Sequence, residues 1–396
     1  MNIPFWPADR QFLRHRDEIL EAIDRVLSKG ELCLGDYGKD ITEFEKWFAE
    51  FVGTKFAIMV GSGTQALYLA YRALGIGPGD EVITVGHTFS ATFDQIVAVG
   101  ATPVLVDIDP ETGLIDPKKV EKAITSRTKA IVPVHLEGKV CFVEAIRNIA
   151  REHNLFVIED AAQAIGATYQ ETFRTLKAGS MGNMGCFSLF PAKILGSVGN
   201  AGAITTNDNE LAYKLRNLRS NYRFEKDPEK VDYGMNFEPD NIQAAVLNVR
   251  AKYLEQDLAD RKDIAEKYLE AFKDLPIKLP LNQEGRVWQD FVIRVNVLDK
   301  PHLVKHLQDN GVGILGQEII PYSRYPKLKL PELPHTNAYL AEQIRLPCRP
   351  EHANEEILYV INTVRSFYKA PIVDGIIFNT IIIAPEKPAS LKQKGE

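Results

Sequence analysis

The chain has 396 residues, and its 47 Lys and Arg against 53 Asp and Glu give a formal net charge of −6 at pH 7. The basic residues are scattered, which predicts no nucleic-acid surface, and the four cysteines form no CxxC pair, which predicts no metal site. No apolar run approaches the roughly 18 residues that cross a bilayer, and the N-terminal residues lack the apolar core of a signal peptide. We therefore expect a soluble, cytoplasmic protein with a small-molecule partner, no membrane contact and two or three domains.

Two amphipathic helices are predicted near the N-terminus. Apolar residues recur at helical spacing between positions 19 and 27 and again between positions 44 and 51. Gly30 and Gly53 follow these runs, where glycine can end a helix in the left-handed conformation. We expect the helices within residues 1–50 to pack on the smaller, C-terminal domain.

From about Lys55 the sequence pattern changes to short β-rich runs that alternate with helical segments. The strand-like runs are FAIMV, EVITV, TPVLVDI, AIVPV and FVIED, and the helical segments include TQALYLAYRAL and CFVEAIRNIARE. This alternation predicts an α/β fold, with a mostly parallel sheet and helices on both of its faces.

A second, smaller domain is predicted after the strand-like GAITT, a helix at 210–219 and a long helix at 241–273. We place the large domain at residues 1–250 and the small α+β domain at 251–396. The small domain contains the strand WQDFVIRVN, the helices HLVKHLQDNG and EEILYVINTVRSFY, and a Pro-rich connection from Pro321 to Pro350. The tail, 369–396, is expected to form an extra strand at 372–383 before a charged end, KPASLKQKGE.

The segment GSGTQAL follows the strand FAIMV and opens a helix, so the backbone N–H groups of Gly63 and Thr64 can bind an anion such as a phosphate. By itself the turn is weak evidence. Such turns are as often only tight connections, and neither GxGxxG nor GxxxxGK[ST] is present.

A second feature is FVIEDAAQAIGA, in which a buried strand delivers Asp160 at its carboxyl end, where open α/β sheets bind their ligands. A carboxylate there can pair with a protonated pyridine nitrogen. The alternative is that Asp160 only caps the following helix.

The third feature is Lys193 in GCFSLFPAKILGSVGNAGAITT, a loop between two β-like runs. Burial in apolar surroundings would lower the amine's pKa from its usual value of about 10.4 and give a nucleophile suited to Schiff-base chemistry. Alone, this residue could equally be an ordinary lysine with its head in water.

Taken together with TFSATFDQIVAVGATPVLVDIDPETGLID, these three blocks resemble the DegT/DnrJ/EryC1/StrS aminotransferases, which act on nucleotide-linked keto sugars. The resemblance runs from about Ile3 to Tyr368. It implies the fold type I architecture of pyridoxal 5'-phosphate (PLP) enzymes and a homodimer in which the partner chain completes each active site.

The resemblance also implies roles for individual residues. Lys193 matches the lysine of the internal aldimine, Asp160 the partner of the pyridine nitrogen and Gln163 a residue near the ring hydroxyl. Ser188, Gly63 and Thr64 match phosphate ligands, and Phe89 falls where an aromatic ring stacks on the cofactor. Asn236 in YGMNFEPDNIQAA matches an asparagine that reaches the phosphate of the neighbouring subunit.

Three departures from the family pattern are visible. Glu238 stands where the family commonly has an arginine, and Ile165 and Asn221 stand where it often has histidines. These changes put substrate contacts in doubt and leave the cofactor chemistry intact. His87 and His135 lie near the motifs, but each is more readily explained as a structural histidine than as a substrate contact.

The sequence thus predicts a PLP-dependent aminotransferase that moves an amino group, from glutamate by resemblance, to a nucleotide-linked keto sugar. Pyridoxamine 5'-phosphate (PMP) would carry the amino group in the second half-reaction, with Lys193 shuttling the proton. One alternative is a PMP-dependent sugar dehydratase, which Lys193 disfavours because that group carries histidine there. Others are a non-catalytic PLP-binding regulatory protein and a nucleotide-binding protein that uses GSGT for a diphosphate.

Overall fold

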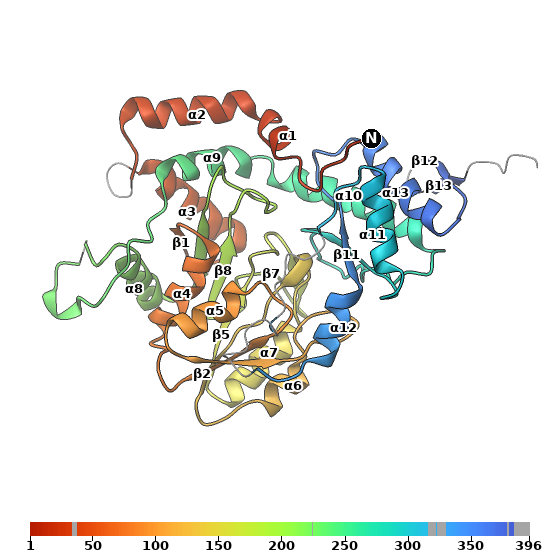
Figure 1. The fold of residues 1–396 in the computed structure, drawn as a ribbon. Coiled ribbons are helices and arrows are strands. Elements are labelled where there is room, and N and C mark those ends of the chain that lie inside the picture. Colours follow the sequence, from red (N-terminus) through yellow and green to blue (C-terminus); the bar gives the residue numbers. More distant parts are fainter. Residues whose placement is uncertain (34–37, 224, 316–321, 323–329, 378–379, 384–396) are drawn as a thin grey trace, which may run out of the picture.

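A seven-stranded sheet in the order β1-β9-β8-β5-β4-β2-β3 forms the centre of the computed structural model (Figure 1). The structure describes residues 1–33, 38–223, 225–315, 322, 330–377 and 380–383. Strand β9 runs antiparallel to both of its neighbours, and the other pairs are parallel. The strands are β1 (Phe56–Val60), β2 (Glu81–Val85), β3 (Thr102–Val106), β4 (Thr128–Ile131), β5 (Phe156–Asp160), β8 (Met184–Ser188) and β9 (Gly202–Thr206).

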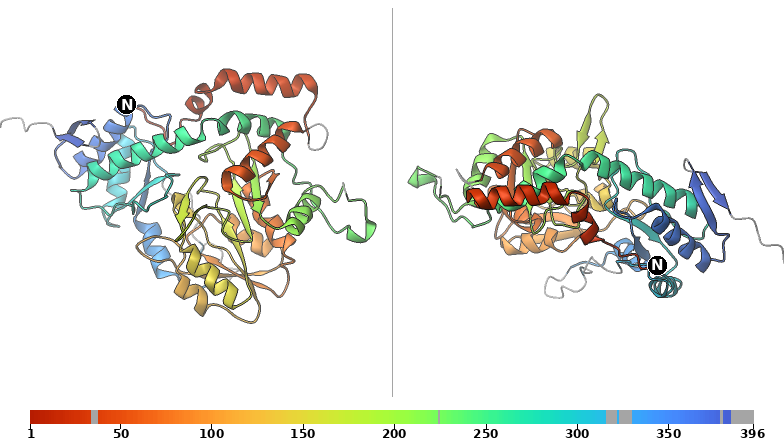
Figure 2. Two further views of the ribbon diagram at one scale, coloured as in Figure 1. Left: turned by 180° about the vertical axis from the view of Figure 1, so that it is seen from behind. Right: turned by 90° about the horizontal axis from the view of Figure 1, so that it is seen from above.

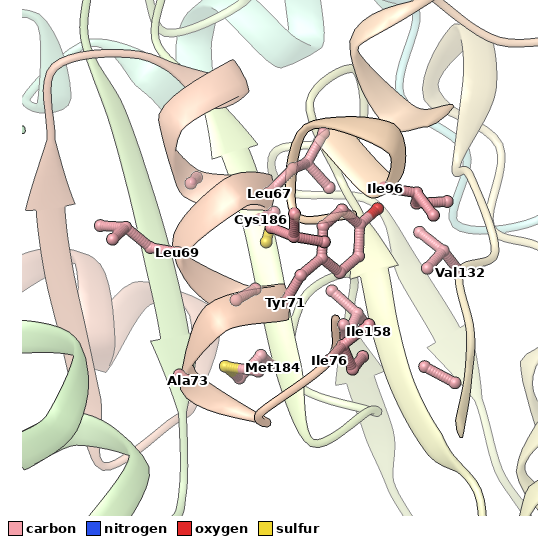
Figure 3. Close-up of a cluster of buried hydrophobic side chains, with 14 of the residues drawn as sticks. Leu67, Leu69, Tyr71, Ala73, Ile76, Ile96, Val132, Ile158, Met184 and Cys186 are labelled. Atoms are coloured by element: carbon pink, nitrogen blue, oxygen red, sulfur yellow. The ribbon is translucent and has the colours of Figure 1, made fainter. Parts of the chain in front are cut away.

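Helices cover both faces of this sheet, which explains why its strands are apolar with little alternation. On one face, Leu67 and Tyr71 lie among Ile158, Met184 and Cys186, as Figure 3 shows. The helices of this face are α4 (Gly63–Ala73), α5 (Ala91–Ala98) and α8 (Asn209–Arg219). The other face carries α3 (Lys39–Val52), α6 (Pro117–Lys122), α7 (Val143–Glu152) and α9 (Asn241–Ala251). The predicted α/β fold is confirmed.

Of the N-terminal helices α1 (Ala8–Leu13), α2 (Arg16–Lys29) and α3, the last two differ from the prediction in their packing. Gly30 and Gly53 end α2 and α3 with φ of 68° and 86°, as predicted. However, α2 buries Ile19 and Val26 against α9, and α3 lies against α9 and β1. The first residues and α1 reach the C-terminal domain, where Ile3 is fully buried and Arg10 pairs with Glu356 on α13 at 2.6 Å. The small side chains of α9, including Ala245, let α2 approach closely.

The predicted long helix at 241–273 is broken into α9 and α10 (Leu254–Phe272). Tyr253, between them, leaves helical geometry with φ of −107° and ψ of 0°, and its ring stacks on His15 at 3.8 Å. The break lets α10 leave the sheet and enter the core of the C-terminal domain with β10 (Phe291–Arg294), α11 (Lys300–Asp309), β11 (Gln343–Leu346) and α13 (Asn354–Phe367). Strands β10 and β11 pair antiparallel.

The predicted Pro-rich connection contains regular structure in its described part, namely α12 (Pro334–Glu342) and β11. Pro321 lies outside the described residues. Although α12 follows residue 250, it packs on the large domain, because Asp107 at the end of β3 accepts the N–H groups of His335 and Thr336 at 3.0 and 2.8 Å. Tyr339 and Leu340 join a core of the sheet.

The tail forms a two-stranded antiparallel hairpin of β12 (Val373–Ile377) and β13 (Thr380–Ile383), where a single extra strand was expected. Asn362 on α13 fixes its start, because its side chain bonds both the N–H and the C=O of Val373. Figure 2 shows the hairpin at the far end of the C-terminal domain from the sheet. The predicted charged end lies outside the described residues. No described helix is both long and apolar enough to cross a membrane.

One short hairpin and two 3-10 turns complete the described chain. Strands β6 (Thr168–Gln170) and β7 (Thr175–Lys177) pair antiparallel beside the main sheet. The 3-10 turns are η1 (Leu136–Gly138) and η2 (Pro228–Lys230). The segment that contains η2, between α8 and α9, projects from the large domain (Figure 2), and its Tyr233 is 86% exposed.

Candidate active site

A cavity of about 410 Å³ lies where β5 and β8 end and α4 begins. This volume is within the usual range for small-molecule sites. Residues from six short segments of the described chain line it, and they include seven of the eight predicted site residues: Gly63, Thr64, Phe89, Asp160, Gln163, Ser188 and Lys193. The eighth, Asn236, is exposed and does not line this cavity.

The turn before α4 is shaped by close backbone contacts. A Cβ on Gly63 would lie 2.8 Å from Cβ of Ser188, and a Cβ on Gly202 would lie 2.4 Å from the carbonyl carbon of Ser62. Ser62 caps the helix by accepting the Gln65 N–H at 3.1 Å. The amides of Gly63 and Thr64, in the first turn, have no intrahelical acceptor and carry the positive end of the helix dipole. Glycine is therefore required here, and the turn suits an anion.

Asp160 ends β5 with only 5% of its surface exposed. The Thr92 hydroxyl donates to Oδ2 at 2.8 Å and the Ala162 N–H donates to Oδ1 at 3.2 Å. Burial raises the pKa of Asp160 above its ordinary value, and the Thr92 and Ala162 hydrogen bonds and the charge of Lys193 partly oppose this. A cation placed beside this buried carboxylate would further stabilise its ionised form.

Thr92 is itself fixed on both sides. Its backbone C=O accepts the hydroxyl of fully buried Tyr71 at 2.9 Å, and its side-chain oxygen lies 2.7 Å from that of Thr88. Since the ionised carboxylate is the strongest acceptor nearby, the Thr92 proton goes to Asp160 and Thr88 donates to Thr92. Three residues of the α4 and α5 region thus determine the position of one carboxylate.

Lys193 lies in the irregular segment between β8 and β9, with its N–H donating to the Phe190 C=O at 2.8 Å. Gln163 accepts the Glu137 N–H at 2.9 Å through Oε1, which leaves its Nε2 as a donor toward other groups. Phe89 is 54% exposed although it lines the cavity, so its ring is available to cover a flat ligand.

Four lining residues with polar side chains were missed by the sequence analysis, namely Ser62, Thr88, Thr92 and Asn200. Ser62 and the two threonines belong to the motifs GSGT and HTFSAT that the sequence had already singled out. The i, i+4 spacing of Thr88 and Thr92 around the start of α5 was a usable signal. Asn200 has no comparable local pattern.

His87 and His135 are buried and do not line the cavity. Burial lowers the pKa of His87 to about 4, and its Nδ1 donates to the Gly113 C=O at 2.8 Å. The Cys141 N–H donates to Nδ1 of His135, so Nε2 carries the proton and donates to Glu159 at 2.8 Å. Both have structural partners. No cluster of three or more His, Cys, Asp or Glu side chains suited to a metal ion occurs in the described part of the chain.

Comparison with known proteins identifies the family. The profile of the DegT/DnrJ/EryC1/StrS aminotransferase family matches residues 14–365. The chain belongs to this family. A dTDP-3-amino-3,6-dideoxy-alpha-D-galactopyranose transaminase from Aneurinibacillus thermoaerophilus is 40% identical over 370 residues, which cover 92% of this chain and 99% of the relative.

Two solved structures superpose closely on this chain. DesV from S. venezuelae, in complex with a ketimine intermediate, has a TM-score of 0.86 and 37% identity, and the match covers 92% of this chain and 98% of that one. NtdA from Bacillus subtilis with bound cofactor PMP has a TM-score of 0.84 and 33% identity, with 93% and 85% covered. The protein is therefore an aminotransferase of the DegT/DnrJ/EryC1/StrS family.

The departures from the DegT/DnrJ/EryC1/StrS pattern have local structural explanations. Glu238 pairs with Arg223 at 2.5 and 2.7 Å, so the acid at this position is neutralised by a neighbouring arginine. Asn221 adopts a φ of 54°, in the left-handed region that asparagine tolerates better than most residues. Ile165 is 2% exposed in the core beneath α3, where a histidine would be desolvated.

Proposed function

We propose that this aminotransferase uses PLP, held by Lys193, to transfer an amino group from glutamate to a nucleotide-linked keto sugar. The observation that carries the proposal is the convergence in one cavity of Lys193, the buried carboxylate of Asp160 and the anion-binding start of α4. These groups match a ligand that has an aldehyde, a basic ring nitrogen and a phosphate. When bound, PLP supplies an electron-withdrawing ring that takes up an amino group from one substrate and releases it to another.

The phosphate end fits the start of α4. The N–H groups of Gly63 and Thr64 and the hydroxyl of Ser188 are donors on one side of the cavity, and a Cβ on Gly63 would close the gap between them. Because helix N-termini favour negative charge, these donors would stabilise a phosphate here.

The ring end fits Asp160. Its carboxylate would hold a proton on the ring nitrogen, and that cation in turn would offset the desolvation of the carboxylate. Gln163 Nε2 would donate to the ring hydroxyl oxygen, since Oε1 is already engaged by Glu137. Phe89 would cover one face of the ring and exclude water from it.

The reactive group of the chain is the Lys193 amine. It would bond covalently to the cofactor when no substrate is present, and once displaced it would move a proton to and from the carbon that gains or loses nitrogen. Lys193 also supports transamination over the alternative of a PMP-dependent dehydratase. By resemblance, the dehydratases of this family carry a histidine at this position.

We further propose a homodimer in which Asn236 completes the neighbouring cavity. Asn236 is exposed in the segment between α8 and α9, and it does not line the cavity of its own chain. The sugar substrate is supported by the transaminase from Aneurinibacillus thermoaerophilus, whose name specifies a dTDP-linked amino sugar.

A panel of nucleotide-linked keto sugars with glutamate as donor tests this function. The expected result is a visible absorbance band in the purified protein and formation of 2-oxoglutarate that depends on one keto sugar. Protein that stays colourless after incubation with PLP would refute the cofactor assignment. A bound cofactor with no turnover on any keto sugar would refute the substrate class.

A further inference from the structure

A glutamine from the C-terminal domain, Gln289, forms hydrogen bonds to the backbone on both sides of Lys193, and we call this pair of bonds the bracket. Nε2 of Gln289 donates to the C=O of Ala192 at 3.1 Å, and its Oε1 accepts the N–H of Ile194 at 3.1 Å. One side-chain amide therefore bonds the residues immediately before and after Lys193. Gln289 is 4% exposed, and it precedes β10 by one residue, Asp290.

The bracket is anchored within the C-terminal domain. Arg261 on α10 donates from Nη1 to the backbone C=O groups of Trp288, Gln289 and Cys348 at 3.0 to 3.2 Å. Arg349, next to Cys348, donates to the same Ala192 C=O at 2.6 Å. Gln289 and Arg349 thus reach Ala192 from two segments that one buried arginine holds together.

The segment that carries Lys193 is also held further along the chain, where Arg250 donates to the C=O of Gly196 and the Ser197 hydroxyl donates to the C=O of Gln243. It contains no helix or strand between β8 and β9, and its local bonds include Lys193 N–H to Phe190 C=O and Ser197 N–H to Leu189 C=O. An amide side chain can satisfy a C=O and an N–H only in one orientation, so Gln289 cannot rotate by half a turn without losing both bonds. The bracket therefore fixes the two peptide planes that set the direction of the Lys193 side chain.

We propose that Gln289 is a positioning residue for the reaction, because its amide fixes the backbone on both sides of Lys193 and makes the reach of that lysine depend on the C-terminal domain. The inference rests on the proposed function of Lys193. Gln289 does not line the cavity, so its effect is exerted through the lysine. A misplacement of about 1 Å at a reacting group can cost on the order of 100-fold in rate.

The test compares Gln289→Leu and Gln289→Asn with a matched control, Gln343→Leu. Gln343 lies in the same domain on β11 and is equally buried, at 3% exposure, with its Oε1 making no hydrogen bond in the described chain. Leucine at 289 removes both bonds, and asparagine keeps an amide that is one methylene too short to span both groups. The three variants are compared with wild type for melting temperature, cofactor retention, kcat and KM.

Hydrogen exchange of the peptide that covers residues 189–197 provides a readout that does not require catalysis. Loss of one buried hydrogen bond of about 1 kcal/mol should speed exchange at Ile194 by roughly fivefold. We expect this increase in Gln289→Leu and Gln289→Asn with and without PLP, together with a kcat about 100-fold lower at little-changed KM. Gln343→Leu should match wild type both in the exchange rate at residues 189–197 and in kcat.

The proposal would be overturned if either Gln289 variant showed the exchange rate and the kcat of wild type. Gln289→Asn provides the test if Gln289→Leu does not fold. A lower melting temperature with unchanged kcat would also overturn it, because it would show Gln289 to be only a contact between domains. Failure of the proposed function looks different. In that case wild type binds no PLP and Lys193 has no catalytic role, while exchange at 189–197 still responds to Gln289.

Discussion

Thr92→Val should make the aminotransferase more sensitive to acid. Valine has nearly the shape of threonine, so the change removes only the hydroxyl, which donates to Asp160 at 2.8 Å and also lies within hydrogen-bond distance of the Thr88 hydroxyl and the Phe89 C=O. That hydrogen bond favours the ionised form of Asp160, and the burial of Asp160 already opposes ionisation. Its loss raises the pKa of Asp160 further, so the carboxylate becomes protonated at a higher pH than in wild type.

The size of the effect follows from the strength of a hydrogen bond to a charged group. Such a bond contributes about 1.5–3 kcal/mol, which corresponds to a roughly 10- to 150-fold change in the protonation equilibrium. At an acidic pH where Asp160 titrates, kcat/KM of Thr92→Val should therefore fall by up to that factor. At a pH where Asp160 is ionised in both wild type and Thr92→Val, the loss of kcat/KM should be much smaller.

The assay is the pH profile of kcat/KM for the glutamate half-reaction, followed through the visible band between pH 5 and 9. Thr88→Val is the matched variant, because Thr88 bonds Thr92 and has no bond to Asp160. We expect its acid limb to move less than that of Thr92→Val. An acid limb of Thr92→Val that stays in place or moves to lower pH would refute the role of this hydrogen bond.

Further predictions concern three other residues. Lys193→Arg should lose turnover by at least about 10³-fold while its melting temperature stays close to that of wild type, and measurable steady-state kcat within tenfold of wild type would contradict the role of Lys193. Gly63→Ala should weaken PLP binding at least about tenfold in equilibrium dialysis, because the new Cβ would lie 2.8 Å from that of Ser188; unchanged affinity would show that the turn can relax. For His87, the folded protein takes up its proton only near pH 4 and the unfolded chain near 6.5, so stability is lost as pH falls below 6.5. Between pH 7.5 and 5 this contributes about 2 kcal/mol of destabilisation, which His87→Gln should remove in urea unfolding; equal pH dependence of both proteins would refute it.

The sequence was most informative where structure is decided locally. Gly30 and Gly53 end their helices as predicted because the left-handed conformation at a helix end depends on the glycine itself. Asp160 and Gly63 were predicted to lie together because the ends of parallel strands and the starts of the following helices meet at one edge of a sheet, and both line one cavity. Lys193 was assigned to the same site through its order in the chain relative to those motifs, and it lines the same cavity.

Contacts between distant segments were beyond the reach of sequence patterns. The bonds of Gln289 and Arg349 to Ala192 join residues that lie 97 and 157 positions apart. The packing of α12 on the large domain depends on Asp107, far earlier in the chain. The break between α9 and α10 was missed because Tyr253 continues a helical pattern, and its stacking on His15 is a tertiary contact.

Identification of the residue that holds the cofactor tests the central claim most directly. The protein is incubated with PLP, reduced with borohydride and digested, and the modified peptide is sequenced by mass spectrometry. We predict loss of the visible band and a single major adduct on the peptide that contains Lys193, absent from Lys193→Arg. An adduct on another lysine, or no adduct in protein that has been saturated with PLP, would contradict the account.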